Sequence, residues 1–327
     1  MKAWLLDTFS GIGSIHLAEV PDPIVGEGEV LVEMRYAALN PADRYLAEKQ
    51  YPAKPPLPHI LGRDGVGIVR RIGHGVKGIQ VGQECIILRS EIGVNRAGTF
   101  AQLVAVPVES LAAVPGQWTA TQAAGAALVY LTAYQALTQW GELPEGVILI
   151  TGASGGVGVA SIQLARAMGH TVVALSRSRA KRDELQKLGA QFTYDPADPQ
   201  WPDELKKTIS PRRVDLAIDN IGGDLLPMVI NTLGDHGRVS LVGRLAGPVP
   251  QFNTATLFFR RLRLGGVAVG AYTATETTAA WREVVALLAK SGAKPVVDRV
   301  FDFEQLPNAF DRLAQGPLGK VLLKIRD

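Results

Sequence analysis

At 327 residues the chain is long enough for two domains, and its 47% hydrophobic and 20% charged residues are typical of a folded globular protein. The formal net charge of +3 is small for this length and gives no support to a nucleic-acid partner. The single cysteine, Cys85, excludes an intramolecular disulfide and any metal site built from several thiolates. Charges within the first seven residues argue against a signal peptide, and the most apolar stretch, 123–134, is too short to cross a bilayer. We therefore expect a soluble, cytoplasmic protein with no membrane partner.

The chain begins with a β-rich region that extends to about residue 120. Short β-branched or alternating segments separated by Gly, Pro and Asp predict strands at Lys2–Leu6, Glu29–Ala38, Val66–Ile72, Glu84–Leu88 and Phe100–Val106. The segment from Asn40 to Pro58 contains five of the 20 prolines, so its backbone lacks many hydrogen-bond donors. We expect it to lie outside any sheet.

A different pattern follows. The segment Thr119–Thr138 is rich in Ala, Leu and Gln and is predicted to be helical. Short apolar strands then alternate with helices, and this alternation predicts a parallel sheet covered on both faces. The predicted elements are Val147–Thr151, Gly156–Met168, Thr171–Leu175, Ala180–Leu188, Asp215–Asp219, a helix near Asp224–Thr232, and Arg238–Val242.

After Arg260 the pattern is mixed, with strands and helices predicted at Leu262–Val269, Glu276–Lys290, Val296–Phe301, Glu304–Gln315 and Lys320–Ile325. The expected fold class is α/β, with a doubly wound parallel sheet inserted into a discontinuous β-rich domain. We predict domain bounds of 1–122 with 268–327, and 123–267, with a cleft between the two domains. The strand at 262–269 should form an apolar sheet edge, and pairing of two such edges predicts a homodimer.

The most informative motif is a glycine-rich loop between a predicted strand and a predicted helix. The strand Val147–Thr151 leads into the loop Gly152–Gly158, and residues 159–165 follow as a helix. Glycines allow the backbone to approach a pyrophosphate, and the N–H groups at the start of a helix favour its charge. The strand before and the helix after make this a specific signal for a dinucleotide.

A serine hydrolase is the competing interpretation of the same loop. Gly152-Ala153-Ser154-Gly155-Gly156 also satisfies the nucleophile-elbow pattern, with Asp219 and His236 in the chain order of a triad. A fourth glycine, Gly158, has no role in such an elbow, and no oxyanion-hole segment precedes the loop.

A basic cluster at the end of the second strand favours the dinucleotide and specifies its type. Leu175 is followed by Ser-Arg-Ser-Arg-Ala-Lys-Arg, about 24 residues after Gly152, where NAD enzymes usually carry an acidic residue for the ribose 2′-hydroxyl. Small hydroxyls and cations suit a 2′-phosphate instead. Basic residues at the start of a helix are otherwise slightly unfavourable. The cluster therefore predicts NADPH, with a solvated helix start as the alternative.

Together with these features, several segments resemble the zinc-free quinone oxidoreductase branch of the medium-chain dehydrogenase/reductases, which includes ζ-crystallin. The resemblance covers nearly the whole chain and implies a GroES-like catalytic domain with an inserted Rossmann domain. Its markers are Ala38–Tyr45, Tyr51-Pro52, Leu61–Gly67, Leu131–Leu137, the Ala153–Gly158 loop and Gly319–Leu323.

Zinc-dependent members of this superfamily carry a catalytic cysteine near Asn40–Asp43 and a histidine where Arg63 stands, and their structural site needs four cysteines. Neither set is present, and the five histidines show no ligand spacing. We predict no metal site and interpret the histidines as structural or surface residues: His16, His59, His74, His170 and His236. Without a Lewis acid for alcohol oxidation, an already electrophilic acceptor is the expected substrate.

The resemblance also implies roles for single residues. Asn40, Tyr45 and Tyr51 match polar residues that line the cleft, and Asn40 and Tyr51 are the candidate hydrogen-bond donors to the acceptor oxygen. The alternatives are a turn-capping Asn40 and a packing role for Tyr51. The candidate cofactor contacts are Thr132, Ser154, Gly155, Gly156, Val157, Ser176, Ser178, Lys181, Tyr194, Gly243, Val267, Ala268 and Val269, together with Arg177 and Arg179, which are additional to the family pattern. Tyr130 departs from the family pattern, and we expect it to narrow the cleft.

The sequence thus predicts a zinc-independent NADPH-dependent reductase of a small electrophilic carbonyl compound, a quinone or an α,β-unsaturated carbonyl. An enoyl-thioester reductase is the nearest alternative, because Asn40–Asp43 with the proline-rich segment 55–58 also resembles that group. Two alternatives from other classes remain open: a crystallin-like protein that binds NADPH without turnover, and a serine hydrolase that uses Ser154.

Overall fold

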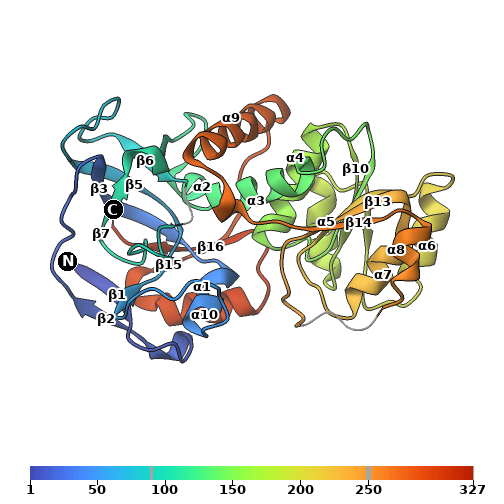
Figure 1. The fold of residues 1–327 in the computed structure, drawn as a ribbon, viewed down its shortest axis with the longest axis horizontal. Helices are drawn as coiled ribbons and strands as arrows, with labels where there is room; N and C mark the ends of the chain where they lie inside the picture. The colour runs from blue at the N-terminus through green and yellow to red at the C-terminus, as the bar shows by residue number, and fades with distance from the viewer. Residues whose placement is uncertain (89–90, 248–251, 327) are drawn as a thin grey trace. The chain divides into compact units, whose positions relative to one another are not determined.

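The computed structural model describes residues 1–88, 91–247 and 252–326. The chain divides into two compact units. Unit 1 comprises Met1–Leu128, Gly270–Trp281 and Lys294–Asp327, and unit 2 comprises Val129–Val269 and Arg282–Ala293. Helix α9 (Ala274–Ser291) contributes residues to both units. Each unit has a sheet of its own (Figure 1).

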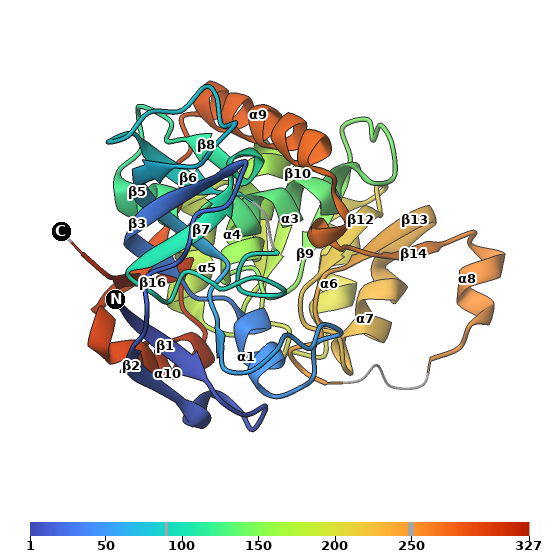
Figure 2. The same cartoon turned by 60° about the vertical axis from the view of Figure 1, so that its left-hand side comes forward.

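Unit 1 is built on a seven-stranded, mainly antiparallel sheet in the order β15-β16-β3-β5-β6-β8, with β7 also paired to β3. A second sheet has the order β2-β1-β4. The strands are β1 (Lys2–Leu6), β2 (Ile15–Glu19), β3 (Glu29–Ala38), β4 (His59–Ile60), β5 (Asp64–Ile72), β6 (Glu84–Ile87), β7 (Leu103–Pro107), β8 (Leu111–Ala113), β15 (Val297–Asp302) and β16 (Lys320–Lys324). Antiparallel pairing joins β16 to β3, with Leu322 opposite Ala38. The sheet therefore combines strands from the two distant parts of the sequence, and Figure 2 shows β3 and β7 running beside each other in it.

The helices of unit 1 are short. They are α1 (Pro41–Ala47), α2 (Ala120–Ala124) and α10 (Leu306–Ala314), with 3-10 turns at Ile12–Ser14, Val108–Ser110 and Phe303–Gln305. A further 3-10 turn, Val269–Ala271, begins at the last residue of the Val129–Val269 segment of unit 2 and continues into unit 1. The proline-rich segment 40–58 contains no strand, as expected, but it does contain α1, which the sequence analysis missed. Pro41 at the first helical position fits this start, because its missing N–H would have no intrahelical partner there.

Unit 2 contains a six-stranded parallel sheet in the order β11-β10-β9-β12-β13-β14. The strands are β9 (Val147–Ile150), β10 (Thr171–Leu175), β11 (Phe192–Tyr194), β12 (Val214–Asp219), β13 (Leu233–Leu241) and β14 (Arg263–Gly266). The strand order runs outward in one direction from β9 and in the other from β12, which defines a doubly wound sheet. Ligands of such sheets bind beyond the carboxyl ends of the strands at this reversal point. The expected α/β fold, with a doubly wound parallel sheet inserted into a discontinuous β-rich part of the chain, is confirmed.

Helix α3 (Ala127–Thr138) precedes β9, and the helices between the strands are α4 (Gly156–Ala167), α5 (Arg179–Lys187), α6 (Trp201–Ile209), α7 (Leu225–Thr232) and α8 (Ala255–Phe259). All four residues of β9 are buried, as expected for a central parallel strand. The helix predicted at 119–138 is two helices, interrupted at Gly125, where an added Cβ would lie 3.1 Å from Cβ of Lys320. The predicted edge strand is present as β14, which ends at Gly266 rather than at residue 269.

Candidate functional site

The glycine-rich loop of unit 2 connects β9 to α4, as the sequence predicts. Gly152 has a φ of +57°, and Gly155 is the N-cap of α4. The first intrahelical hydrogen bond runs from Val159 N to Gly155 O (2.9 Å), so the preceding N–H groups are those that a helix start leaves for a ligand. At Gly158 a Cβ would lie 2.5 Å from Cα of Ala153, so only glycine permits α4 to pack this closely on the loop. The predicted contact residues Ser154, Gly155, Gly156 and Val157 are half-buried along this turn.

The hydrolase alternative fails on the topology of the same sheet. Asp219 ends β12 and is fully buried, with its Oδ1 accepting a hydrogen bond from Oγ1 of Thr151 (2.6 Å). In β13, Leu241 lies opposite Asp219, whereas His236 lies five residues earlier, toward the amino ends of the strands. At about 3.3 Å per residue, this separates His236 by roughly 15 Å from the sheet edge that carries Ser154. A triad of Ser154, Asp219 and His236 does not form.

The predicted phosphate-binding cluster lies at the carboxyl ends of β10 and β11. Ser178 is the N-cap of α5, and its Oγ accepts a hydrogen bond from Lys181 N (3.4 Å). Ser176 is buried, Lys181 is half-buried, and Arg177 and Arg179 are exposed. No aspartate or glutamate occupies residues 176–182.

The last cation of this cluster, Arg182, makes contacts that the sequence did not predict. Nη1 of Arg182 donates to the carbonyl oxygen of Ser176 (2.7 Å) and to Oδ2 of Asp195 (3.1 Å). Both partners hold the guanidinium of Arg182, which is half-buried, whereas the arginines before it in the cluster are exposed. Tyr194 ends β11, and its hydroxyl donates to Oγ1 of Thr208 on α6 (3.0 Å). The Tyr194 hydroxyl thus bonds α6 rather than another member of the predicted cluster.

The other predicted cofactor residues of unit 2 lie on three elements. Gly243 follows β13, where an added Cβ would lie 2.8 Å from the carbonyl oxygen of Asn220. Val267 follows β14, and its N–H donates to Leu241 O (2.9 Å). Val269 is half-buried and Ala268 is exposed, and Thr132 is half-buried on α3.

The expectation that Tyr130 narrows a cleft is wrong. This side chain is 2% exposed inside unit 2, and its hydroxyl donates to Oε1 of Gln163 on α4. Burial raises the pKa of the phenol, so the hydroxyl stays protonated. Tyr130 therefore fills the interior between α3 and α4.

Unit 1 contains a second polar region, in which the charges are buried. A tight turn positions it: Gly62 has a φ of +98°, and a Cβ there would lie 2.5 Å from Oγ1 of Thr99. The next two residues, Arg63 and Asp64, are 3% and 0% exposed. Charged side chains of this kind are rarely so buried unless they are paired.

Lys320 pairs with Asp64 and fixes the side chain of Asn40. Nζ of Lys320 donates to Oδ2 of Asp64 (3.2 Å), Oδ1 of Asn40 (2.6 Å) and the carbonyl oxygen of Leu39 (3.0 Å). Nδ2 of Asn40 donates to Oδ2 of Asp64 (3.2 Å) and, at a longer distance, to the carbonyl oxygen of Ala38 (3.4 Å). Both ends of the Asn40 amide are therefore engaged within the protein.

Arg63 contacts the other candidate donor, Tyr51. Nη1 of Arg63 donates to the Tyr51 hydroxyl (3.1 Å), and the guanidinium carbon lies 4.4 Å from the centre of the Tyr51 ring. Nη2 donates to the carbonyl oxygen of Ala42 (3.3 Å), and Nε lies 3.5 Å from Oδ1 of Asp43. Tyr45, the third candidate, is half-buried on α1.

Asp43 is the most perturbed carboxyl of this region. Burial raises its pKa from 3.8 to about 6, although the nearby Arg63 and Lys320 cations oppose the shift. Its Oδ2 accepts a hydrogen bond from Asn40 N (2.8 Å), whereas Oδ1 has no hydrogen-bond partner among the described residues. The carboxyl therefore changes between its protonated and ionised forms near pH 6.

Two family models match the chain: "Zinc-binding dehydrogenase" over residues 156–305 and "Alcohol dehydrogenase GroES-like domain" over residues 26–116. The human synaptic vesicle membrane protein VAT-1 homolog is 30% identical over 99% of this chain and 86% of its own length. The chain belongs to the medium-chain dehydrogenase/reductase family. The quinone oxidoreductase of Sus scrofa is 26% identical over 94% of this chain and 92% of its own length. A solved structure described as an NAD-dependent alcohol dehydrogenase superimposes with a TM-score of 0.91 at 28% identity, covering all of both chains.

As a medium-chain dehydrogenase/reductase, the protein is an oxidoreductase of a family in which NAD(P) binding is typical.

Within the described ranges, no three His, Cys, Asp or Glu side chains are grouped so that they could hold a metal ion. Cys85 is buried, and burial raises the pKa of its thiol to about 12. His59 and His170 are buried, and burial lowers the pKa of both.

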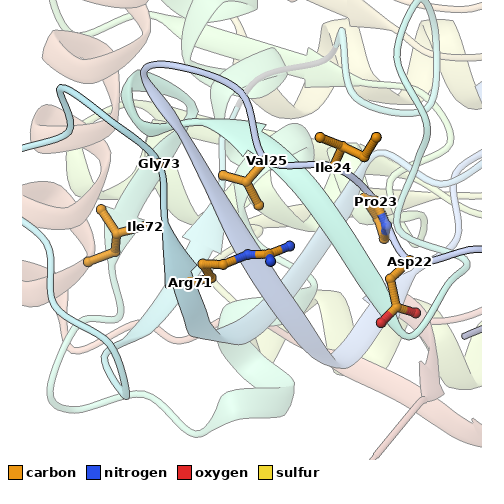
Figure 3. A pocket seen from close by; sticks show the side chains of 7 residues that line it. All are labelled: Asp22, Pro23, Ile24, Val25, Arg71, Ile72 and Gly73. Atoms are coloured by element: carbon orange, nitrogen blue, oxygen red, sulfur yellow. The ribbon is translucent and has the colours of Figure 1, made fainter.

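A hollow of about 400 Å³ lies elsewhere on unit 1, between segments 22–25 and 71–73 (Figure 3). The acidic residue of its lining, Asp22, accepts a hydrogen bond from the N-terminal ammonium group (3.1 Å). None of the predicted site residues lines it.

No helix within the described parts of the chain is both long and apolar enough to cross a membrane.

Proposed function

We infer that the protein is an NADPH-dependent reductase of quinones or α,β-unsaturated carbonyl compounds that works without a metal ion. The observation that carries this inference is the edge of the unit 2 sheet at its reversal point. A glycine loop and a helix start lie there, and the neighbouring strand ends in hydroxyls and cations. The similarity to quinone oxidoreductases supports the acceptor class.

The residues of this edge fit a dinucleotide with a 2′-phosphate. The loop residues Ser154, Gly155, Gly156 and Val157 would hold the pyrophosphate, because Gly158 keeps the start of α4 close to the turn. The 2′-phosphate would lie among residues that present hydroxyls or positive charge: Ser176, Arg177, Ser178, Arg179, Lys181 and Tyr194. The nicotinamide half would contact Thr132, Gly243, Val267, Ala268 and Val269. These assignments, and residues 123–267 as the nucleotide-binding domain, are part of the proposal.

When bound, NADPH supplies a hydride, which carries two electrons and one proton. Reduction of a quinone to a hydroquinone, or of an enone to a saturated ketone, needs one further proton. We assign this proton to the Tyr51 hydroxyl, because the Asn40 amide is engaged at both ends by Lys320 and Asp64. Asn40 then serves to hold the start of α1 in place, and Tyr45 lines the acceptor site on the same helix.

The absence of metal is part of the same proposal. At the positions where zinc-dependent relatives carry cysteine and histidine ligands, this chain has Asn40, Asp43 and Arg63. None of the three is a thiolate or an imidazole, and each contacts other groups of the protein. The expected enzyme therefore keeps its activity in a chelator, and metal analysis finds no stoichiometric zinc. About one zinc per chain, with activity lost on its removal, would overturn this part.

The test is a screen of the purified protein for NADPH oxidation, followed by NADPH absorbance, with quinones, enones, enoyl thioesters and saturated aldehydes as acceptors. NADH with each acceptor is the control for cofactor choice. We expect turnover with quinones or enones and little with saturated aldehydes. Dominant turnover of enoyl thioesters would instead identify an enoyl-thioester reductase. Tight NADPH binding with no turnover of any acceptor would indicate a non-catalytic role.

A further inference from the structure

The contacts of Arg63 extend its role beyond that of a buried structural cation. Its guanidinium is 3% exposed and contacts three groups at once, namely the Asp43 carboxyl, the Ala42 carbonyl and the Tyr51 hydroxyl. Burying such a charge is expensive unless several partners compensate for it. One of those partners is a phenol that accepts a hydrogen bond although it is also able to donate one.

The direction of the bond between Arg63 and Tyr51 is fixed by chemistry. A guanidinium has only donors, so the Tyr51 oxygen must be the acceptor at 3.1 Å. One lone pair of that oxygen is therefore used, and the hydroxyl hydrogen is directed away from Arg63. The contact of the guanidinium with the ring, at 4.4 Å, also restricts the rotation of the phenol.

We propose that Arg63 is a positioning residue that aims the Tyr51 hydroxyl at the acceptor oxygen and stabilises the phenolate left when the proton departs. The proposal rests on the proposed function and deepens it. In the step it describes, the Tyr51 O–H bond breaks and its proton passes to the oxygen of the reduced acceptor. With a quinone this completes the hydroquinone, and with an enone it gives the enol, which tautomerises to the saturated ketone. Solvent then returns a proton to Tyr51. Arg63 supplies positive charge beside the donor, without a metal.

A purely structural role for Arg63 is the competing explanation. Its bond to Ala42 and its proximity to Asp43 both stabilise the start of α1, so loss of Arg63 would also disturb local packing. A structural effect would reduce activity to the same degree whether or not residue 51 has a hydroxyl. The positioning effect requires that hydroxyl, and this difference separates the two explanations.

The experiment is a double-mutant cycle of Arg63→Met and Tyr51→Phe, with kcat, KM and NADPH affinity measured on the best acceptor from the screen. We expect each single variant to lose at least tenfold in kcat, with NADPH affinity changed less than twofold. The double variant should be no worse than Tyr51→Phe alone, because the Arg63 effect passes through the hydroxyl. Arg63→Lys keeps the positive charge but loses the planar guanidinium with its several N–H donors, so its kcat should lie between those of Arg63→Met and wild type.

Arg312→Met is the matched control, because Arg312 is an ion-paired arginine of the same unit, bonded to Asp298 at 2.7 Å and 2.8 Å. It should leave kcat unchanged. Equal losses from Arg63→Met in both backgrounds, with wild-type activity intact, would overturn the positioning role and leave the proposed function standing. If Arg63→Met does not fold, Arg63→Lys carries the same cycle. If the wild-type protein turns over no acceptor, the proposed function and this inference fall together.

Discussion

The two polar regions of this protein differ in what supplies their chemistry. At the sheet edge of unit 2, backbone N–H groups and partly exposed cations form the region, and a glycine loop of consecutive residues determines its shape. In unit 1, fully buried side chains from distant parts of the chain form the region, and each contacts the next. The first region suits a mobile, charged ligand that arrives from solvent, whereas the second suits a fixed donor whose surroundings must not change. Substitutions should therefore affect cofactor binding in unit 2, and stability or turnover in unit 1.

The largest expected effect is on the buried pair of unit 1. Lys320→Met removes the ammonium and leaves the Asp64 carboxylate buried without its partner, which should lower the free energy of unfolding by about 3–5 kcal/mol. Urea unfolding of the purified variant measures this loss. Lys2→Met, at an exposed lysine of the same unit, is the control. Adding Asp64→Asn should recover part of the loss, and a double variant less stable than Lys320→Met would contradict the pairing.

Asp43 gives the next effect, and its sign depends on pH. Because burial raises the Asp43 pKa to about 6, its contribution to stability is fully present below 3.8 and is lost as the pH rises through 6. Asp43→Asn, which is neutral at every pH, should therefore be more stable than wild type at pH 8 by roughly 3 kcal/mol at most. The difference should shrink as the pH falls from 6 toward 4. Urea unfolding of both proteins between pH 4 and pH 8 measures this difference in stability. A variant less stable than wild type at pH 8 would mean that the attraction between Arg63 and the Asp43 carboxylate outweighs the cost of burying that charge.

In unit 2 the largest effect should follow from Gly158→Ala. The added methyl group would lie 2.5 Å from Ala153 Cα, so α4 must move away from the loop that we assign to the pyrophosphate. We expect NADPH affinity to fall roughly a hundredfold, about 2.7 kcal/mol, while unit 1 is unchanged. Titration of cofactor fluorescence measures the affinity. Gly13→Ala is the control and should not change the affinity, because a Cβ there meets nothing within 4 Å. An unchanged NADPH affinity in Gly158→Ala would mean that the loop does not bind the pyrophosphate.

The smallest effect distinguishes the two cofactors. Lys181→Ala should weaken NADPH binding about tenfold and leave NADH binding nearly unchanged, because only NADPH carries the 2′-phosphate. Arg179→Ala should do less, since this side chain is exposed and its interaction is screened by salt. Affinities for both cofactors at low and high salt are the measurement. If Lys181→Ala lowers the affinity for both cofactors equally, the basic cluster is a solvated helix start and does not bind the 2′-phosphate.

The comparison also explains which features the sequence predicted. The β9–loop–α4 motif depends on residues close together in the chain and on an unusual glycine pattern, so the sequence alone predicts it. Helix α6 was missed although Trp201, Leu205 and Ile209 show helical spacing and are buried, because Pro202 obscured its start. Strand β11 has only three residues, too few for a clear pattern.

The contacts inside the regions were harder to predict. Lys320 bonds Asn40 across 280 positions of the sequence, and Arg182 bonds Asp195 across 13, and no local pattern specifies either pair. Tyr130 illustrates the opposite error: its departure from the family pattern suggested a tyrosine that narrows the cleft, whereas α4 offers Gln163 as an interior partner. Motifs report where a backbone turns, but a buried side chain's partner depends on how distant elements pack.

The long sequence separation within the Lys320 network has a consequence for biosynthesis. Lys320 follows Asp64 by 256 positions, so a ribosome must add all of unit 2's strands before it adds this residue. The nascent chain therefore holds Asp64 and Asn40 without their ammonium partner while the parallel sheet has already been translated. Translation order favours folding of the parallel sheet of unit 2 first, and the buried charges of unit 1 are neutralised only when β16 pairs with β3.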